Sequence, residues 1–182
     1  MDNMVSCNTE VQMNVMPKVY RSTIVAKEML KLATGENKTL TPMQLIKLVY
    51  LAHCWMLALY SRPLIEEPIE AWKYGPVIPE LYHDIKHYGS NPVKEIKVLD
   101  FDVLDEEGNP IKEVNHNEEK FDPDSKNTID QVYKKYAYLD GIELSIITHT
   151  KNSPWEVTWG SSNNIISNDL ITYYYRQLLS NE

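Results

Sequence analysis

One long apolar stretch with helical spacing, at residues 41–60, most constrains how this chain can fold. Thr41 has an N-cap side chain, Pro42 fits the first helical position, and Gln44 lies at the spacing of a capping box. Apolar residues line one face of the expected helix (Leu45, Leu48, Val49, Ala52, Met56, Leu59) and also the opposite face (Met43, Ile46, Tyr50, Cys54, Leu57). A helix that is apolar nearly all round is buried within a domain. Three polar residues inside the stretch argue against a membrane span of the same length. We therefore predict a buried central helix.

The remaining patterns predict a mainly α fold with a small β element. The chain has 182 residues, of which 43% are hydrophobic and 24% charged, as is typical of one globular domain. We expect a flexible N-terminal tail at 1–17 and a single compact helical domain at 18–182. Further helices are expected at 19–33, 79–88, 128–138, 140–148 and from 167 onward. The β element is expected to comprise a short strand at 69–73, followed by a rigid turn at 74–79, and a β-hairpin at 94–114. Irregular loops are expected at 115–127 and 149–164.

Apolar residues around the start of the last helix predict how it packs. Ile166 before the cap and Ile171 inside the helix have the spacing of a hydrophobic staple. We expect Leu170, Tyr173 and Tyr174 to face the core.

Acidic residues are concentrated between Asp100 and Asp124. This segment holds ten acidic residues against two lysines, so it accounts for the whole net charge of −8. Nucleic-acid binding without sequence preference needs clustered Lys and Arg, and we therefore expect no direct contact with nucleic acid. Two interpretations of the segment stay open. It is either a solvated surface, or a patch whose Asp105, Glu106 and Glu107 steer a basic partner.

Nothing in the chain indicates a metal, cofactor or membrane site. His83 and His87 have a chelating i, i+4 spacing, but a third ligand on the same face is missing. Thr148 and His149 form a polar pair at the end of an apolar helix, where the imidazole is expected to interact with the last carbonyls. The first residues lack a secretory signal, which predicts a cytoplasmic protein whose two cysteines are free thiols.

Aromatic residues surround a stiff turn in the stretch EPIEAWKYGPVIPELYHDIKHYG. Trp72, Tyr74 and Tyr82 flank Gly75, which can adopt φ > 0, and Pro76, which stiffens the exit. Aromatic residues on a rigid backbone suit a binding surface, because little entropy is lost on docking. They suit a small core equally well, and both interpretations stay open on the residues alone.

Three segments resemble the Panacea (SocA-like) antitoxin domain, which also occurs in phage-associated proteins. They are KLVYLAHCWMLAL, the aromatic stretch above, and LSIITHTKNSPW, and the similarity extends over about residues 45–178. The middle motif, A-W-x-Y-G-P-V-x-P-x-L-Y, is long and highly specific. The third, T-H-x(4)-P-W, is present as Thr148, His149, Pro154 and Trp155.

The resemblance implies an antitoxin of a two-gene toxin–antitoxin system that neutralises a cognate toxin by direct protein–protein binding. Some members of the family deliver the toxin to a Clp-type protease, so a proteolytic adaptor is one alternative. A small enzyme using Thr148 and His149 is the other, and it is the less favoured. Many antitoxins carry a DNA-binding domain, but the residues before the match hold one predicted helix and a tail. That length argues against transcriptional autoregulation by this chain.

The turn, the acidic segment and the resemblance together predict a set of partner-binding residues. The oligomeric state is left open. The predicted residues are Trp72, Tyr74, Gly75, Pro76, Val77, Tyr82, Lys86, Asp105, Glu106, Glu107, His149 and Trp155.

Overall fold

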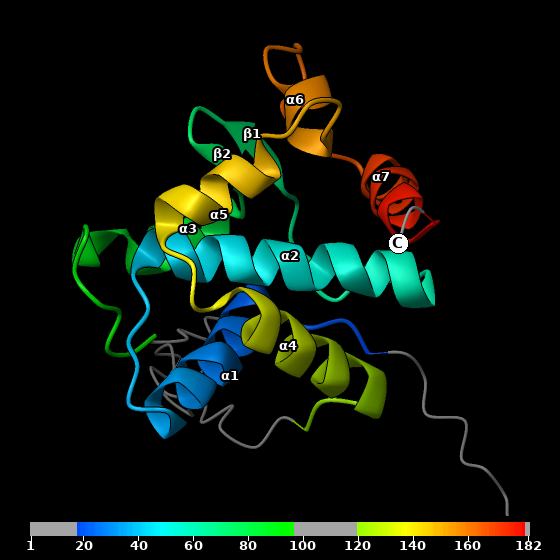
Figure 1. Cartoon of the computed structure of the whole chain (residues 1–182). Helices are drawn as coiled ribbons and strands as arrows, with labels where there is room; N and C mark the ends of the chain where they lie inside the picture. Colours follow the sequence, from blue (N-terminus) through cyan, green and yellow to red (C-terminus); the bar gives the residue numbers. More distant parts are fainter. Residues whose placement is uncertain (1–17, 97–119, 181–182) are drawn as a thin grey trace, which may run out of the picture.

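Helix α2 (Pro42–Tyr60) lies at the centre of the computed structural model, which describes residues 18–96 and 120–180. It runs across the middle of the molecule in Figure 1, with α1 (Ser22–Gly35) and α4 (Pro123–Tyr136) on one side. A two-stranded sheet and α5 (Gly141–Thr148) lie on the other side, and α7 (Asn168–Ser180) packs against the C-terminal part of α2. The predicted mainly α fold around a buried central helix is confirmed.

The start of α2 forms the predicted capping box. The Gln44 N–H donates to Thr41 Oγ1 at 3.4 Å, and the Gln44 side chain accepts from the Thr41 N–H at 3.0 Å. Two residues predicted to be inside, Met43 and Leu59, are 37% and 52% exposed, because they lie near the two ends of the helix. Among the described residues α2 is long and apolar enough to cross a membrane, yet 72% of its most apolar window is buried in the fold. It is therefore a core helix.

The β element has a different second strand from the predicted one. Strand β1 (Glu70–Trp72) confirms the expected strand and pairs antiparallel with β2 (Gly75–Val77). The sequence predicted only a turn at 74–79. Trp72 instead pairs with Gly75, so a two-residue connection joins the strands directly. The hairpin predicted at 94–114 lies mostly outside the described residues, and its described part, 94–96, forms no strand.

Two helices begin where the sequence predicted loops. Helix α4 starts at Pro123 because the Asp122 carboxylate accepts a hydrogen bond from the Ser125 N–H at 3.1 Å. Helix α6 (Pro154–Thr158) forms inside the predicted irregular segment, with Ser153 as its N-cap. Both helices have Pro at the first position, which is a favourable start.

The other helices follow the sequence more closely. Helix α3 (Pro79–Ile85) continues as the 3₁₀ turn η1 (Lys86–Tyr88) and stops at Gly89. Helix α1 starts at Ser22 and not at residue 19, because the buried Glu67 carboxylate accepts from the Ser22 N–H at 2.8 Å.

The start of α7 has the predicted staple residues buried. Ile166 and Ile171 are 3% and 0% exposed. Tyr173, which was predicted to face the core, is exposed, and Tyr175 is buried in its place.

His53 joins α2 to two later segments of the chain. Its Nδ1 accepts a hydrogen bond from the Ile65 N–H at 3.2 Å, and its Nε2 bonds Asn168 Oδ1 at 2.9 Å. Because Nδ1 is an acceptor, the proton of the neutral ring is on Nε2. Burial lowers the pKa of His53 to about 4. The buried imidazole is therefore neutral at physiological pH.

Acid is expected to destabilise the fold through His53. The unfolded-state pKa of about 6.5 lies above the folded value, so the unfolded chain binds more protons below pH 6.5. The contribution of neutral His53 to the free energy of unfolding is complete above pH 6.5 and is lost as the pH falls towards 4. Between pH 7.5 and 5 the loss is about 2 kcal/mol. When the free energy of unfolding is measured in urea at pH 7.5 and at pH 5, it should fall by about 2 kcal/mol less for His53→Gln than for wild type. Equal losses in the two proteins would contradict the assignment.

Candidate partner-binding hairpin

Side chains from three helices hold the β1–β2 hairpin on the rest of the fold. We call these three residues, Lys47, Ser145 and Trp155, the hairpin clamp. Each donates a hydrogen bond to a hairpin carbonyl: Trp155 Nε1 to Trp72 at 2.7 Å, Ser145 Oγ to Tyr74 at 2.9 Å, and Lys47 Nζ to Pro76 at 2.9 Å. The carbonyls belong to every second residue of the hairpin. The three hydrogen bonds therefore fix the position of the hairpin relative to α2, α5 and α6.

Gly75 is a point at which the hairpin backbone lies very close to Lys47. Its φ is +103°, a region that favours glycine, as the sequence predicted. A Cβ at this position would lie 2.5 Å from Lys47 Nζ and 3.1 Å from His149 Nε2. The backbone conformation therefore favours glycine here, and any side chain at this position would also displace the Lys47 ammonium group.

Two basic side chains meet behind Gly75. Lys47 is 2% exposed, and burial lowers the pKa of its ammonium group to about 7. Burial and the nearby Lys47 charge also lower the pKa of His149. The His149 Nε2 atom is buried without a hydrogen-bond partner among the described residues, and its ring centroid lies 3.8 Å from that of Trp155. The electrostatics of this site disfavour any further positive charge.

Thr148 and His149 are not hydrogen-bonded to each other through the Thr148 hydroxyl in this arrangement. The Thr148 hydroxyl donates to the Ser145 carbonyl at 3.0 Å and not to His149. The sequence predicted that the imidazole interacts with the last helix carbonyls. No such bond forms at its Nε2 atom, which is buried without a hydrogen-bond partner among the described residues. Among the described residues no group of His, Cys, Asp and Glu could hold a metal ion.

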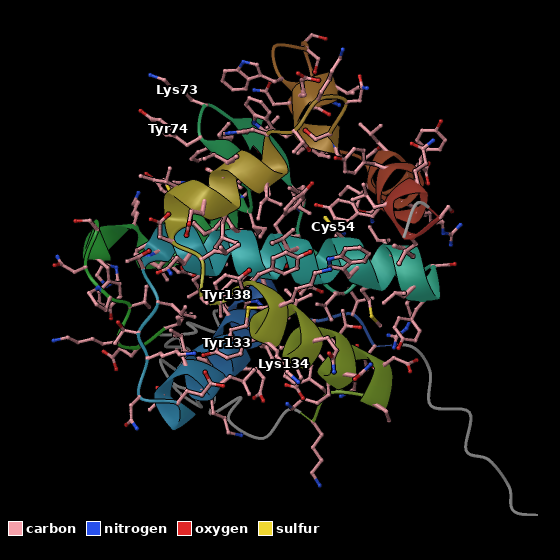
Figure 2. All side chains as sticks on the ribbon, in the orientation of Figure 1. Cys54, Lys73, Tyr74, Tyr133, Lys134 and Tyr138 are labelled. Atoms are coloured by element: carbon pink, nitrogen blue, oxygen red, sulfur yellow. The ribbon has the colours of Figure 1, made fainter. Side chains whose placement is uncertain are left out.

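The aromatic residues of the hairpin and of the neighbouring helix α3 divide into an outward and an inward set. Tyr74 is 62% exposed, and the Lys73 ammonium group lies 5.3 Å from its ring centroid. Figure 2 shows Lys73 and Tyr74 at the outer end of the hairpin, away from α2. Trp72 and Tyr82 are half-buried and contact each other edge to face, with centroids 5.0 Å apart. Tyr74 is thus the aromatic side chain of the hairpin that a partner can reach.

The other predicted site residues lie in several different places. Lys86 is exposed on η1, with its Nζ 3.0 Å from His83 Nδ1. Gly75, Pro76 and Val77 are buried, so they shape the hairpin from within. His149 and Trp155 are half-buried behind it. Asp105, Glu106 and Glu107 lie outside the described residues. The partner-binding role of the whole set stays a prediction.

Two clamp residues were missed by the sequence interpretation. Lys47 is a lysine within a mostly apolar helix, and that context was a usable signal for a buried amine with a specific hydrogen-bond acceptor. Ser145 gave no comparable signal, because its acceptor is the Tyr74 carbonyl, 71 positions earlier in the chain.

The hairpin therefore combines a fixed backbone with one exposed aromatic side chain, Tyr74. Comparison with known proteins gives the family. The family described as "Antitoxin SocA-like, Panacea domain" matches residues 45–156, more than half of the chain, and the chain belongs to this family. Antitoxin SocA of Caulobacter vibrioides (strain NA1000 / CB15N) is 27% identical over 143 residues, which are 78% of this chain and 71% of that protein. No solved structure matches.

Proposed function

We propose that this chain is the antitoxin of a two-gene system and that it neutralises its toxin by direct, stoichiometric binding in the cytoplasm, without catalysis. Membership of the SocA-like antitoxin family supports a cognate toxin as the partner. The observation that carries the binding role is the clamped hairpin, which exposes Tyr74 on a fixed backbone. Pre-organisation of this kind favours affinity, because little conformational entropy is lost on binding.

Growth rescue tests this function. The gene next to this one is expressed from an inducible promoter, with and without the antitoxin chain. We expect arrest with the neighbouring gene alone and normal growth with both. Repeating the assay in cells that lack the Clp-type protease separates two mechanisms, because a blocker still rescues growth and an adaptor does not. A neighbouring gene that is harmless, or that is never neutralised, would contradict the proposal.

Tyr74→Ala is expected to weaken toxin binding by about 10- to 100-fold, as truncation of an interface tyrosine often does. The fold should be unchanged, because the side chain is exposed. Tyr173→Ala is the matched control, since Tyr173 is 65% exposed on α7, away from the hairpin. Calorimetric titration with the purified toxin measures both variants. Equal affinities for Tyr74→Ala and wild type would remove Tyr74 from the interface.

A further inference from the structure

We propose that the toxin-binding surface continues from Tyr74 onto the outer face of α5, with Ile142 and Ile146 at its centre. The toxin would present an apolar area to these residues, an acidic group to Lys73 and a basic group to Glu143. This inference rests on the proposed function and extends it to residues that the sequence interpretation did not include.

Helix α5 is apolar on both of its faces. Leu144 is fully buried against the core, whereas Ile142 and Ile146 are 67% and 65% exposed. The two isoleucines are four residues apart, so they lie on the same face, one turn from each other. Large exposed apolar patches mark protein–protein interaction sites, and these two isoleucines form the α5 part of the patch proposed here.

The clamp makes this helix face and the hairpin tip one rigid surface. Ser145 lies between the two isoleucines in the sequence, and its Oγ donates to the Tyr74 carbonyl at 2.9 Å. The backbone of Tyr74 is therefore fixed against the turn of α5 that carries Ile142 and Ile146. The three apolar side chains are each more than 60% exposed. We expect the binding energy to concentrate on these exposed apolar side chains.

Charges at the edges of this surface indicate what binds there. On the hairpin side, Lys73 forms no ion pair with a carboxylate among the described residues, and its ammonium group lies 5.3 Å from the centre of the Tyr74 ring. On the side where α5 begins, Asp140 and Glu143 form a capping box and are both exposed. A complementary partner therefore has an apolar centre, an acidic group on the side that faces Lys73, and a basic group on the side that faces Glu143.

A second copy of the chain is the competing occupant. It could match these edge charges locally, because the surface carries both signs. Each copy, however, has a net charge of −8, and the repulsion between two such copies opposes self-association. A toxin that is neutral or basic meets no such repulsion. We therefore assign the surface to the toxin.

The test compares the double variant Ile142→Ala/Ile146→Ala with Val157→Ala, a control on α6 at a residue that is 57% exposed. Alanine is the best helix former, so the double variant should keep or raise its melting temperature. The probe is the purified product of the neighbouring gene, chosen because wild type suppresses its toxicity. We expect the double variant to raise the Kd by about 30-fold or more, and the control to change it by less than about threefold.

Each other outcome overturns the inference in a recognisable way. An unchanged Kd for the double variant removes α5 from the interface, while binding by wild type leaves the proposed function intact. Failure of wild type to bind any toxic neighbour overturns the function, and the inference with it. Sedimentation of the chain alone is the third readout, and we expect a monomer. A wild-type dimer that Ile142→Ala/Ile146→Ala dissociates would assign this face to a second copy.

Discussion

Ala52→Asp is expected to leave the chain unfolded at 25 °C. Ala52 has no exposed surface and lies in the middle of α2, which contacts α1, α4, α5 and α7. An unpaired carboxylate there would have to be buried charged or protonated, and either costs several kcal/mol out of a total stability of about 5–15 kcal/mol. Circular dichroism and thermal melting measure the effect.

An aspartate introduced near the end of α2 provides the control. Leu59 is 52% exposed, so Leu59→Asp should change stability by no more than about 1 kcal/mol. A smaller core change, Leu48→Ala, should cost about 2–5 kcal/mol, because Leu48 is fully buried. If Ala52→Asp melted at the wild-type temperature, α2 could not be the buried centre of the fold.

Gly75→Val is expected to abolish neutralisation and to destabilise the fold by about 2–5 kcal/mol. Two costs add at this position. Valine tolerates the φ of +103° poorly, and its Cβ would lie 2.5 Å from Lys47 Nζ. The clamp bond from Lys47 to the Pro76 carbonyl would break, and the exposed tip would move. Melting temperature and growth rescue record the two effects separately.

Gly160→Val separates backbone strain from the steric clash. Gly160 also has a positive φ, of +80°, but a Cβ there would have no atom within 4 Å. We expect it to cost only the strain of about 1–2 kcal/mol and to leave neutralisation intact. If Gly75→Val lowered the melting temperature and neutralisation no more than Gly160→Val does, the close contact of residue 75 with Lys47 and His149 would have no role.

Local signals in the sequence were sufficient for the central part of the fold. The Thr41 capping box and the apolar residues after it predicted both the start of α2 and its burial, because both depend on neighbours within a few positions. Gly75 was predicted to be free to adopt a positive φ for the same reason, and it does so. The starts of α4 and α6 had comparable signals in Asp122-Pro123 and Ser153-Pro154. There the polar composition of the surrounding segments led to the wrong prediction.

Features that depend on distant residues could not be predicted in this way. The Ser22 cap comes from Glu67, 45 positions later, and Lys47 finds its acceptor at Pro76, 29 positions later. The exposed face of α5 was hidden for another reason. Its isoleucines and Leu144 are equally apolar, so only the packed structure shows which face is left for a partner.

Titration of the purified toxin with this chain, in the absence of any protease, tests direct neutralisation most directly. Toxin activity is measured at increasing ratios of wild-type chain, and the clamp-disrupting variant Gly75→Val is titrated in parallel. We predict that activity falls linearly and disappears at one equivalent of wild type, and that the variant leaves most of it. Full toxin activity in the presence of excess folded wild type would contradict neutralisation by binding.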